Sequence, residues 1–276
     1  MRGSCAILLE KSWRNYLNFK FDCFYRADIE RVSLSQQVAN KFVEFRCADG
    51  VAMPAYFVCP AEPGTFSGAF PGILFIYEAF GMNDEMRRLA DSFAAEGFAV
   101  MIPDLFSRST WFSCIRKLMA DLKNECGRGV DDLLAAREWL VAQPEVDGAK
   151  TAVLGLCMGG GFALLLSKTG LFRVAAPFYG HVPASLKGAC PIVASYGGKD
   201  LAFAPHFKRL KQEVKKESIT ADVKNYRSAG HSFMNKSPNV GLALLGKALP
   251  IHTGHNPKAE KDARKRVVKF LRTHLG

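Results

Sequence analysis

The feature that most constrains the fold of this chain is a repeated order of short apolar runs and longer amphipathic segments. Most of the apolar runs show little alternation of apolar and polar residues, which predicts strands that are covered on both faces. We therefore expect an α/β protein with a mostly parallel central sheet flanked by helices on both faces. The predicted strands span residues 72–77, 98–102, 151–156, 174–179, 191–196 and 221–226.

Segments with helical spacing lie between and after these strands. In the first of them, Met86, Leu89, Ala90 and Phe93 share one face of a predicted helix. The stretch from 105 to 129 shows no clear pattern. We predict helices at residues 84–96, 130–142, 205–217 and 258–272, and another that starts just after Cys157.

An antiparallel hairpin is predicted ahead of the first buried strand. Residues 42–46 alternate, residues 48–50 (Ala-Asp-Gly) supply turn chemistry, and residues 51–58 extend again. Pro54 has no backbone N–H to donate, so it fits a strand at the edge of a sheet better than one at the centre.

The length of the chain suits one large domain. Its 276 residues are 49% hydrophobic, which is enough to bury a sizeable core. We expect a single domain over residues 39–276, preceded by a poorly ordered extension at residues 1–38 that shows no sustained period.

The formal charge of +11 raises the question of a nucleic-acid partner. Much of the excess lies at residues 208–216 and 258–272, where basic residues would occupy the outer face of amphipathic helices. No zinc-finger, RNP-type or helix-turn-helix pattern accompanies the charge, so we interpret it as a solvated surface and expect no nucleic-acid partner. The short apolar run at residues 6–9 is too short to cross a membrane or to serve as an export signal.

The eight cysteines lack the C-x-x-C spacing of a zinc site or redox pair. We therefore expect reduced thiols, no metal and no cofactor, in a cytoplasmic monomer whose partner is a small-molecule substrate.

A glycine-rich segment, Gly155-Leu-Cys-Met-Gly-Gly160, joins the predicted strand at 151–156 to a helix. A sharp turn from strand to helix needs glycines on both sides of the residue at its apex, which here is Cys157. At a helix N-terminus, free amides and the helix dipole favour the thiolate form of a cysteine. The segment predicts a nucleophile, with a buried and inert cysteine as the alternative.

Four strand ends deliver side chains that could do chemistry: Glu78, Cys157, Asp200 and His231. Because the carboxyl ends of parallel strands share one edge of the sheet, we expect these groups to lie together. Alternatives stay open: Asp200 could cap a helix, Glu78 could be a structural hydrogen-bond acceptor, and His231 could be an ordinary loop histidine. His181 also follows a strand and could compete as the base, although it precedes Asp200 in the chain.

Four motifs follow one another along the chain: Glu78 with Phe80-Gly81-x-Asn83, Gly155-x-Cys157-x-Gly159-Gly160, Gly198-x-Asp200 and Gly230-His231-Ser232-Phe233. Together they resemble the dienelactone hydrolase family, over roughly residues 42–275. The order nucleophile, acid, histidine is also that of the α/β-hydrolase triad. The resemblance implies an α/β-hydrolase fold and hydrolysis of an ester or lactone through an acyl-cysteine.

The roles follow from general chemistry. Cys157 attacks the carbonyl carbon, His231 holds the thiolate and later activates water, and Asp200 fixes the orientation of the imidazole. The backbone amides of Ala79 and Met158 are placed to hold the oxyanion. The resemblance adds one hypothesis, in which Glu78 helps to form the thiolate when substrate arrives.

The resemblance also suggests how substrate is held. Arg108 matches an arginine that lies near the substrate carboxylate in the family, with an exposed loop arginine as the alternative. Asn235 stands where enzymes that act on dienelactone carry a second arginine, so dienelactone is a doubtful substrate; Lys236 could supply the charge from another direction. Trp111 either lines the pocket or packs a lid onto the core.

A second functional class stays open. The chain could be a non-catalytic or redox-regulated member of the fold, in which Cys157 is a sensor thiol.

Overall fold

The structure is a computed structural model that describes residues 38–61, 69–236 and 251–276. The predicted N-terminal extension lies outside the described residues, apart from Val38, which begins the first strand.

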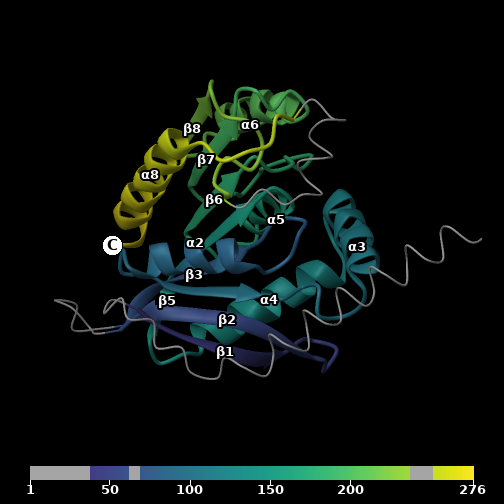
Figure 1. Cartoon of the computed structure of the whole chain (residues 1–276), viewed down its shortest axis with the longest axis vertical. Coiled ribbons are helices and arrows are strands. Elements are labelled where there is room, and N and C mark those ends of the chain that lie inside the picture. The colour runs from purple at the N-terminus through teal and green to yellow at the C-terminus, as the bar shows by residue number, and fades with distance from the viewer. Residues whose placement is uncertain (1–37, 62–68, 237–250) are drawn as a thin grey trace, which may run out of the picture.

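The described strands form one eight-stranded sheet in the order β1-β2-β4-β3-β5-β6-β7-β8 (Figure 1). The pairs from β4 to β8 are parallel, whereas β1 and β2, and β2 and β4, are antiparallel. The predicted mostly parallel sheet is confirmed. The strands are β1 (Val38–Arg46), β2 (Ala52–Pro60), β3 (Phe70–Ile76), β4 (Ala99–Pro103), β5 (Val146–Leu156), β6 (Val174–Phe178), β7 (Ile192–Gly197) and β8 (Ala221–Tyr226).

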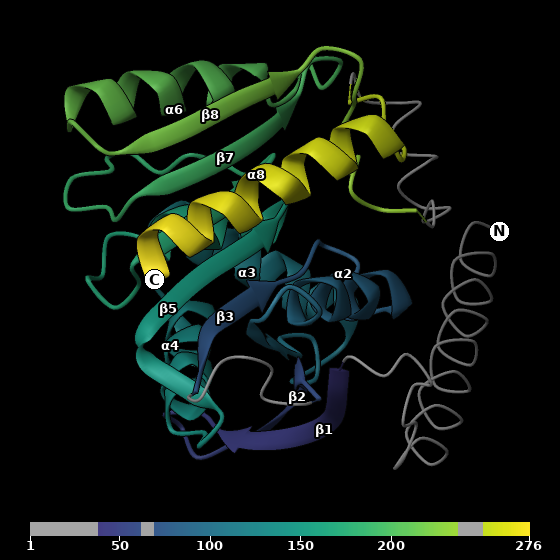
Figure 2. The same ribbon diagram turned by 90° about the vertical axis from the view of Figure 1, so that its left-hand side faces the viewer.

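Helices cover both faces of this sheet. Helix α8 runs across the face turned to the viewer in Figure 2 and packs on β5, β6 and β7. Helix α5 packs on β3, β5 and β6, and Figure 1 shows it on the other side of β6 from α8. The helices are α2 (Asp84–Ala94), α3 (Trp111–Asn124), α4 (Arg128–Val141), α5 (Met158–Leu166), α6 (Ala204–Lys216) and α8 (Pro257–Leu275).

Asparagine side chains cap the N-termini of two of these helices, α2 and α8. The Asn83 side chain accepts a hydrogen bond from the Met86 N–H at 3.1 Å, and Asn256 accepts one from the Ala259 N–H at 3.1 Å. Each bond satisfies one of the amides that the first turn of a helix leaves free. These caps fix where α2 and α8 leave the preceding loops.

The predicted hairpin is formed by β1 and β2, with β1 at the edge and β2 one strand further in. Pro54 therefore lies on an inner strand. It precedes Ala55, where the pairing of β2 with β4 begins, so its missing N–H removes no bond from that ladder.

Helix α3 was not predicted, because its apolar residues lie on both faces. Trp111, Phe112 and Met119 are exposed, whereas Cys114 and Leu118 are buried. A helix with apolar residues on both faces lacks the one-sided pattern from which a surface helix is recognised.

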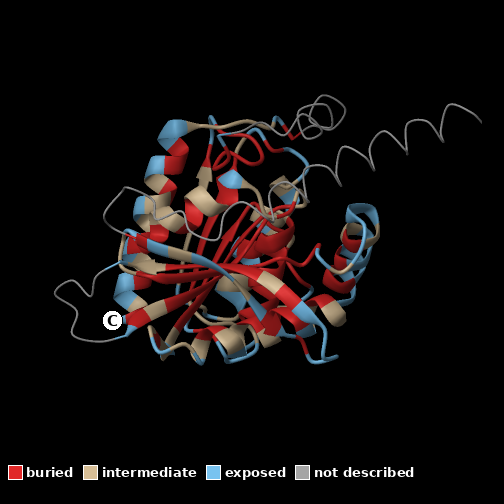
Figure 3. Ribbon diagram, turned by 60° about the horizontal axis from the view of Figure 1, so that its bottom comes forward, coloured by how far each residue is buried: buried red, intermediate tan, exposed pale blue. Residues whose placement is uncertain are grey.

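The core lies in the sheet and under its helices, as the buried residues in Figure 3 show. Every residue of β3 except Pro71 is buried. Among the described residues, no helix combines the length and the apolar character needed to cross a membrane.

We expect Phe75→Ala in β3 to lower the free energy of unfolding by about 3–5 kcal/mol, because the ring is fully buried and its removal leaves a cavity. The matched control is Phe112→Ala on α3, where the side chain is 67% exposed and the change should stay within about 0.5 kcal/mol. Urea denaturation followed by circular dichroism measures both. Equal losses would contradict this description of the core.

Candidate active site

Cys157 joins β5 to α5 in a backbone conformation with a positive φ, at φ 54° and ψ −112°. Such a conformation is costly for a residue other than glycine and persists only where neighbouring contacts hold it. One such contact is the hydrogen bond from the Cys157 N–H to the Phe178 carbonyl of β6, at 3.0 Å. The thiol is thereby held at the carboxyl end of β5, at the start of a helix.

Two glycines allow the turn, as the sequence predicts. A Cβ atom on Gly159 would lie 2.1 Å from the Ile76 carbonyl oxygen of β3, and one on Gly155 would lie 2.0 Å from the Gly159 carbonyl oxygen. Both distances are far inside van der Waals contact, so any side chain would push α5 away from the sheet.

The structure brings Cys157, Asp200 and His231 together. Asp200 follows β7 and His231 follows β8, and the Asp200 Oδ2 atom lies 2.6 Å from His231 Nδ1. Both side chains are buried. Because Asp200 holds Nδ1, the other ring nitrogen is left for Cys157, whose thiol the imidazole contacts.

The pKa of His231 reflects these neighbours. Burial of the ring opposes the charged form and lowers the pKa, but Cys157 and Asp200 outweigh it and raise the pKa to about 10. At neutral pH the ring therefore carries a proton that it can share with a thiolate or give to a leaving group.

Glu78 is a buried carboxyl that belongs to the same cluster. The Ser232 hydroxyl donates a hydrogen bond of 2.6 Å to its Oε2 atom. Burial raises the pKa of Glu78, while Ser232, His231 and Asn235 partly offset that rise. The carboxyl is thus more easily protonated than an exposed glutamate.

Asn235 is buried, and its side chain lies within hydrogen-bonding reach of the Glu78 carboxyl. An uncharged amide therefore occupies the position where enzymes of the family that act on dienelactone carry a second arginine. Lys236 is exposed, and its backbone N–H donates to Glu85.

The two amides expected to hold an oxyanion follow neighbouring strands. Met158 is the first residue of α5, so its N–H has no acceptor one turn earlier in the helix. Ala79 follows β3, and its carbonyl accepts a 2.8 Å hydrogen bond from Trp111 Nε1. Trp111 is 43% exposed and thus lies at the surface over the loop that carries Ala79.

Arg108 is not available to bind a substrate carboxylate. Its side chain is only 6% exposed and is bound by two carboxylates, from Asp132 in α4 and from Asp49 in the turn between β1 and β2. Its Nε atom donates to Asp132 at 2.7 Å and its Nη1 atom donates to Asp49 at 2.7 Å. This arrangement contradicts both expectations for Arg108, because the guanidinium is neither near a free anion site nor exposed.

Cys47, Asp49 and Asp132 form the one cluster in the described part of the chain whose spacing suits a metal ion. Arg108 is paired with both carboxylates, and burial raises the pKa of the Cys47 thiol to about 11. The cluster is therefore an ion-pair network with a protonated thiol beside it.

His181 does not take the place of the base. Its ring contacts His206, with 4.5 Å between the ring centroids, whereas Asp200 pairs with His231. His206 Nδ1 in turn accepts a hydrogen bond from the Val182 N–H at 3.2 Å.

Two aromatic residues that we did not predict flank the imidazole. The centroid of Tyr179 lies 4.8 Å from that of His231, and the centroid of Phe203 lies 4.7 Å from it. Tyr179 directly follows β6, so the strand-end reasoning that found the other groups could have found it. Burial raises its pKa well above the usual range, and Glu78 and Cys157 add to that rise, so the hydroxyl keeps its proton.

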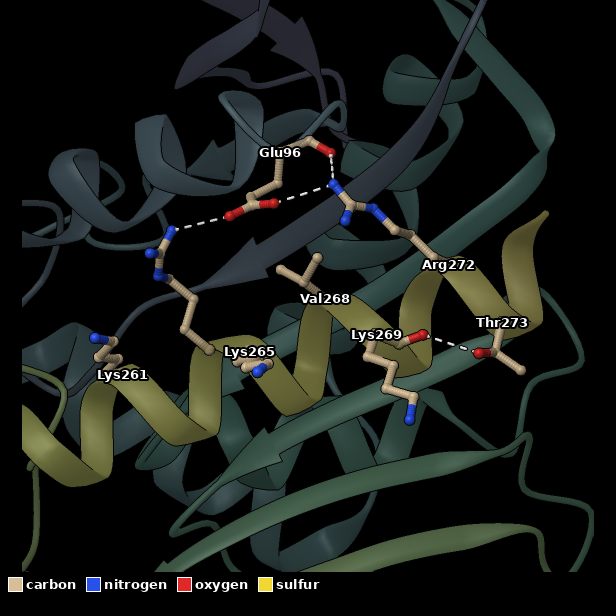
Figure 4. A pocket seen from close by; sticks show the side chains of 8 residues that line it. Glu96, Lys261, Lys265, Val268, Lys269, Arg272 and Thr273 are labelled. Atoms are coloured by element: carbon tan, nitrogen blue, oxygen red, sulfur yellow. Dashed lines mark hydrogen bonds and ion pairs between the residues drawn. The ribbon is translucent and has the colours of Figure 1, made fainter.

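A basic groove of about 590 Å³ lies beside α8, shown in Figure 4. Within it, Glu96 bridges Arg264 and Arg272. Glu96 lies shortly before β4, at the amino ends of the parallel strands, whereas Cys157 lies at their carboxyl ends. The groove is therefore separate from the cluster of Cys157, Asp200 and His231. Its lining residues are Glu96, Lys261, Arg264, Lys265, Val268, Lys269, Arg272 and Thr273.

Comparisons with known proteins identify the family of the chain. A carboxymethylenebutenolidase of Rhodococcus opacus is 27% identical over 226 residues, which cover 76% of this chain and 83% of the relative. A carboxymethylenebutenolidase of Pseudomonas putida is 29% identical over 189 residues, covering 63% and 79%.

Among solved structures, a dienelactone hydrolase-like promiscuous phosphotriesterase from metagenomic libraries superposes with a TM-score of 0.71 at 24% identity. The match covers 87% of this chain and 100% of that protein, and it confirms the α/β-hydrolase fold. The model of the dienelactone hydrolase family matches residues 53–275. The chain is therefore a hydrolase that belongs to the dienelactone hydrolase family.

Proposed function

We propose that this hydrolase cleaves small carboxylic esters or lactones through an acyl-cysteine on Cys157, with His231 as base and Asp200 as its orienting acid. The observation that carries the proposal is the 2.6 Å contact between Asp200 and His231, whose ring also contacts the thiol at the turn between β5 and α5. A nucleophile, a base and a group that orients the base are the three parts that such catalysis needs.

The first half-reaction transfers the acyl group. The Cys157 thiolate forms a bond to the carbonyl carbon, and the negative charge moves to the carbonyl oxygen, beside the amides of Ala79 and Met158. When the bond from carbon to the leaving oxygen breaks, the His231 imidazolium donates its proton to that oxygen. The products are an alcohol and a thioester on Cys157; in a lactone the alcohol stays attached to the acyl group.

The second half-reaction consumes one water. The water oxygen attacks the thioester carbon while His231, now neutral, accepts a proton from the water. The carbon–sulfur bond then breaks, Sγ leaves as a thiolate beside the imidazolium, and the carboxylic acid departs and ionises in solvent. The starting ion pair is thereby restored.

Glu78 has a proposed part in the first half-reaction. Its buried carboxyl has a raised pKa, so it can take up a proton more readily than an exposed glutamate. In this proposal Glu78 accepts the thiol proton when substrate arrives and then gives it to solvent. This leaves the Cys157 thiolate beside the His231 imidazolium, and the Glu78 carboxylate is ionised again before the second half-reaction.

For the substrate, we propose esters and lactones that need no carboxylate of their own. Arg108 is bound by Asp49 and Asp132, and Asn235 is uncharged. Trp111 lies over the loop of Ala79, where it can contact an apolar acyl or alcohol group.

The redox-sensor alternative makes a different prediction. It expects reversible oxidation of Cys157 without turnover of any ester in a broad panel. The membership of the chain in a family of hydrolases does not favour it.

We expect Cys157→Ala and His231→Ala each to lower turnover of an activated ester by at least about 10³-fold, with an unchanged circular dichroism spectrum. Each change removes a group that forms or breaks a bond. Cys126→Ala is the matched control, since that cysteine is exposed and should not matter. A screen of the wild type against esters, thioesters and lactones, with Cys157→Ser beside it, selects the assay. Full activity in Cys157→Ala would refute the proposal.

The protonation of His231 can be followed directly by NMR of the ring nitrogens. We expect the wild-type ring to be protonated at neutral pH and to lose its proton as the pH rises through about 10. In Asp200→Asn and in Cys157→Ser the midpoint should fall, because each change removes a negative partner and leaves the opposing effect of burial. A wild-type midpoint below pH 7 would show that no imidazolium is present for the thiolate.

The role of Glu78 can be measured through alkylation of Cys157 by iodoacetamide, followed by peptide mass spectrometry. With a substrate analogue bound, we expect Glu78→Gln to slow alkylation by about tenfold, because an amide cannot accept the thiol proton. Glu85→Gln is the matched control: that carboxyl is also buried but is bound by Arg88. If Glu78→Gln alkylates like the wild type at every pH, with and without the analogue, Glu78 takes no part in activation.

A further inference from the structure

Five buried side-chain polar atoms lack a hydrogen-bond partner within the part of the chain that the structure describes. Two of the five, Tyr179 Oη and Glu78 Oε1, belong to the catalytic cluster. A buried polar atom without a partner is costly, so two of them at one site call for a ligand that supplies the missing bonds.

Tyr179 lies beside the proposed base and directly follows the residue that binds the backbone of the proposed nucleophile. It follows Phe178, whose carbonyl accepts the Cys157 N–H, and its ring lies against the His231 ring at 4.8 Å. Its backbone has a φ of 39°, which is unusual for a large side chain, and its N–H donates to the Ser195 carbonyl at 2.8 Å. The backbone is thus fixed in a conformation that places this ring at the site.

Other buried tyrosines of the sheet show that an unpaired hydroxyl is not the rule. The Tyr196 hydroxyl donates to the Gly180 carbonyl at 2.8 Å, and the Tyr77 hydroxyl donates to Asp104 and accepts from the Phe106 N–H. Tyr179 is as fully buried as these two. The Met234 N–H lies close to the Tyr179 hydroxyl, but no described group accepts the proton of that hydroxyl, and this distinguishes Tyr179 from the other two tyrosines.

The chemistry of the two atoms identifies the ligand. Tyr179 Oη–H is a donor, whereas the ionised Glu78 carboxylate accepts. Both lie beside the base, since Tyr179 contacts the His231 ring and Glu78 is bonded to Ser232, the next residue. A molecule that accepts from one and donates to the other is water, and water is the reactant that His231 must activate to release the acyl group.

We propose that Tyr179 Oη and Glu78 Oε1 form the binding site of the water that hydrolyses the thioester on Cys157. The proposal rests on the proposed function and assigns this pair to its second half-reaction. Tyr179 orients the water oxygen, one water proton points to Glu78, and the other passes to His231 as the new carbon–oxygen bond forms. Attack by the thiolate uses neither hydroxyl nor water, so the first half-reaction does not depend on Tyr179.

The test is Tyr179→Phe, which removes only the hydroxyl and keeps the ring contacts. With p-nitrophenyl acetate, rapid-quench kinetics measure release of nitrophenol and intact-protein mass spectrometry measures acetylated Cys157. We expect release of the first equivalent to stay within about threefold of the wild type and deacylation to slow by about tenfold or more, so that the acetyl-enzyme accumulates.

Tyr196→Phe is the matched control, because it removes an equally buried hydroxyl that has a partner. It should leave both half-reactions unchanged, even where thermal unfolding shows a loss of stability. Added hydroxylamine, a strong nucleophile that needs no water site, should discharge the acetyl-enzyme of Tyr179→Phe at a rate close to that of the wild type.

The outcomes separate the two proposals. A wild type that forms no acetyl-Cys157 refutes the proposed function. A wild type that forms it, together with a Tyr179→Phe variant that deacylates at the wild-type rate, overturns the water site alone. Equal slowing of both half-reactions in Tyr179→Phe also overturns it, because that result indicates a general effect on the fold of the site.

Discussion

The contact on which the site depends is the approach of the start of α5 to the backbones of β3 and β6. Gly159 lies against the Ile76 carbonyl, and a Cβ atom on Gly160 would come within 2.5 Å of the Phe178 carbonyl. Because the helix rests directly on the strands, Cys157 stands beside the residues that follow them, Glu78 and Tyr179. One stretch of close backbone packing thus sets the position of the thiol and of its neighbours.

At the site, burial and neighbouring charges have opposite effects on the pKa of His231. The interior disfavours the charge on the His231 ring, and the ring stays protonated only because Asp200 and Cys157 lie on it. Glu78 lies in the same interior without an ion pair from an arginine among the described residues, so its affinity for a proton rises. Two groups with raised pKa values, one basic and one acidic, therefore lie in one buried cluster.

The parallel sheet and the positions of Cys157, Asp200 and His231 could be predicted because both depend on local pattern: apolar runs mark strands, and polar residues after strands meet at one edge. The ion pairs of Arg108 could not be predicted from the sequence. Its partners come from a hairpin turn 59 residues away and from a helix 24 residues away, and no local sequence pattern near Arg108 indicates them. That the buried Tyr179 hydroxyl lacks an acceptor likewise cannot be read from the sequence, because it depends on burial and on contacts in the folded chain.

The hydrogen bond from Trp111 to the Ala79 carbonyl joins the first residue of α3 to the loop that follows β3. A molecule that displaces the indole therefore also breaks the contact between α3 and that loop. Because Ala79 is one of the two residues proposed to hold the oxyanion, we expect the fit of an ester against Trp111 to change kcat more than KM.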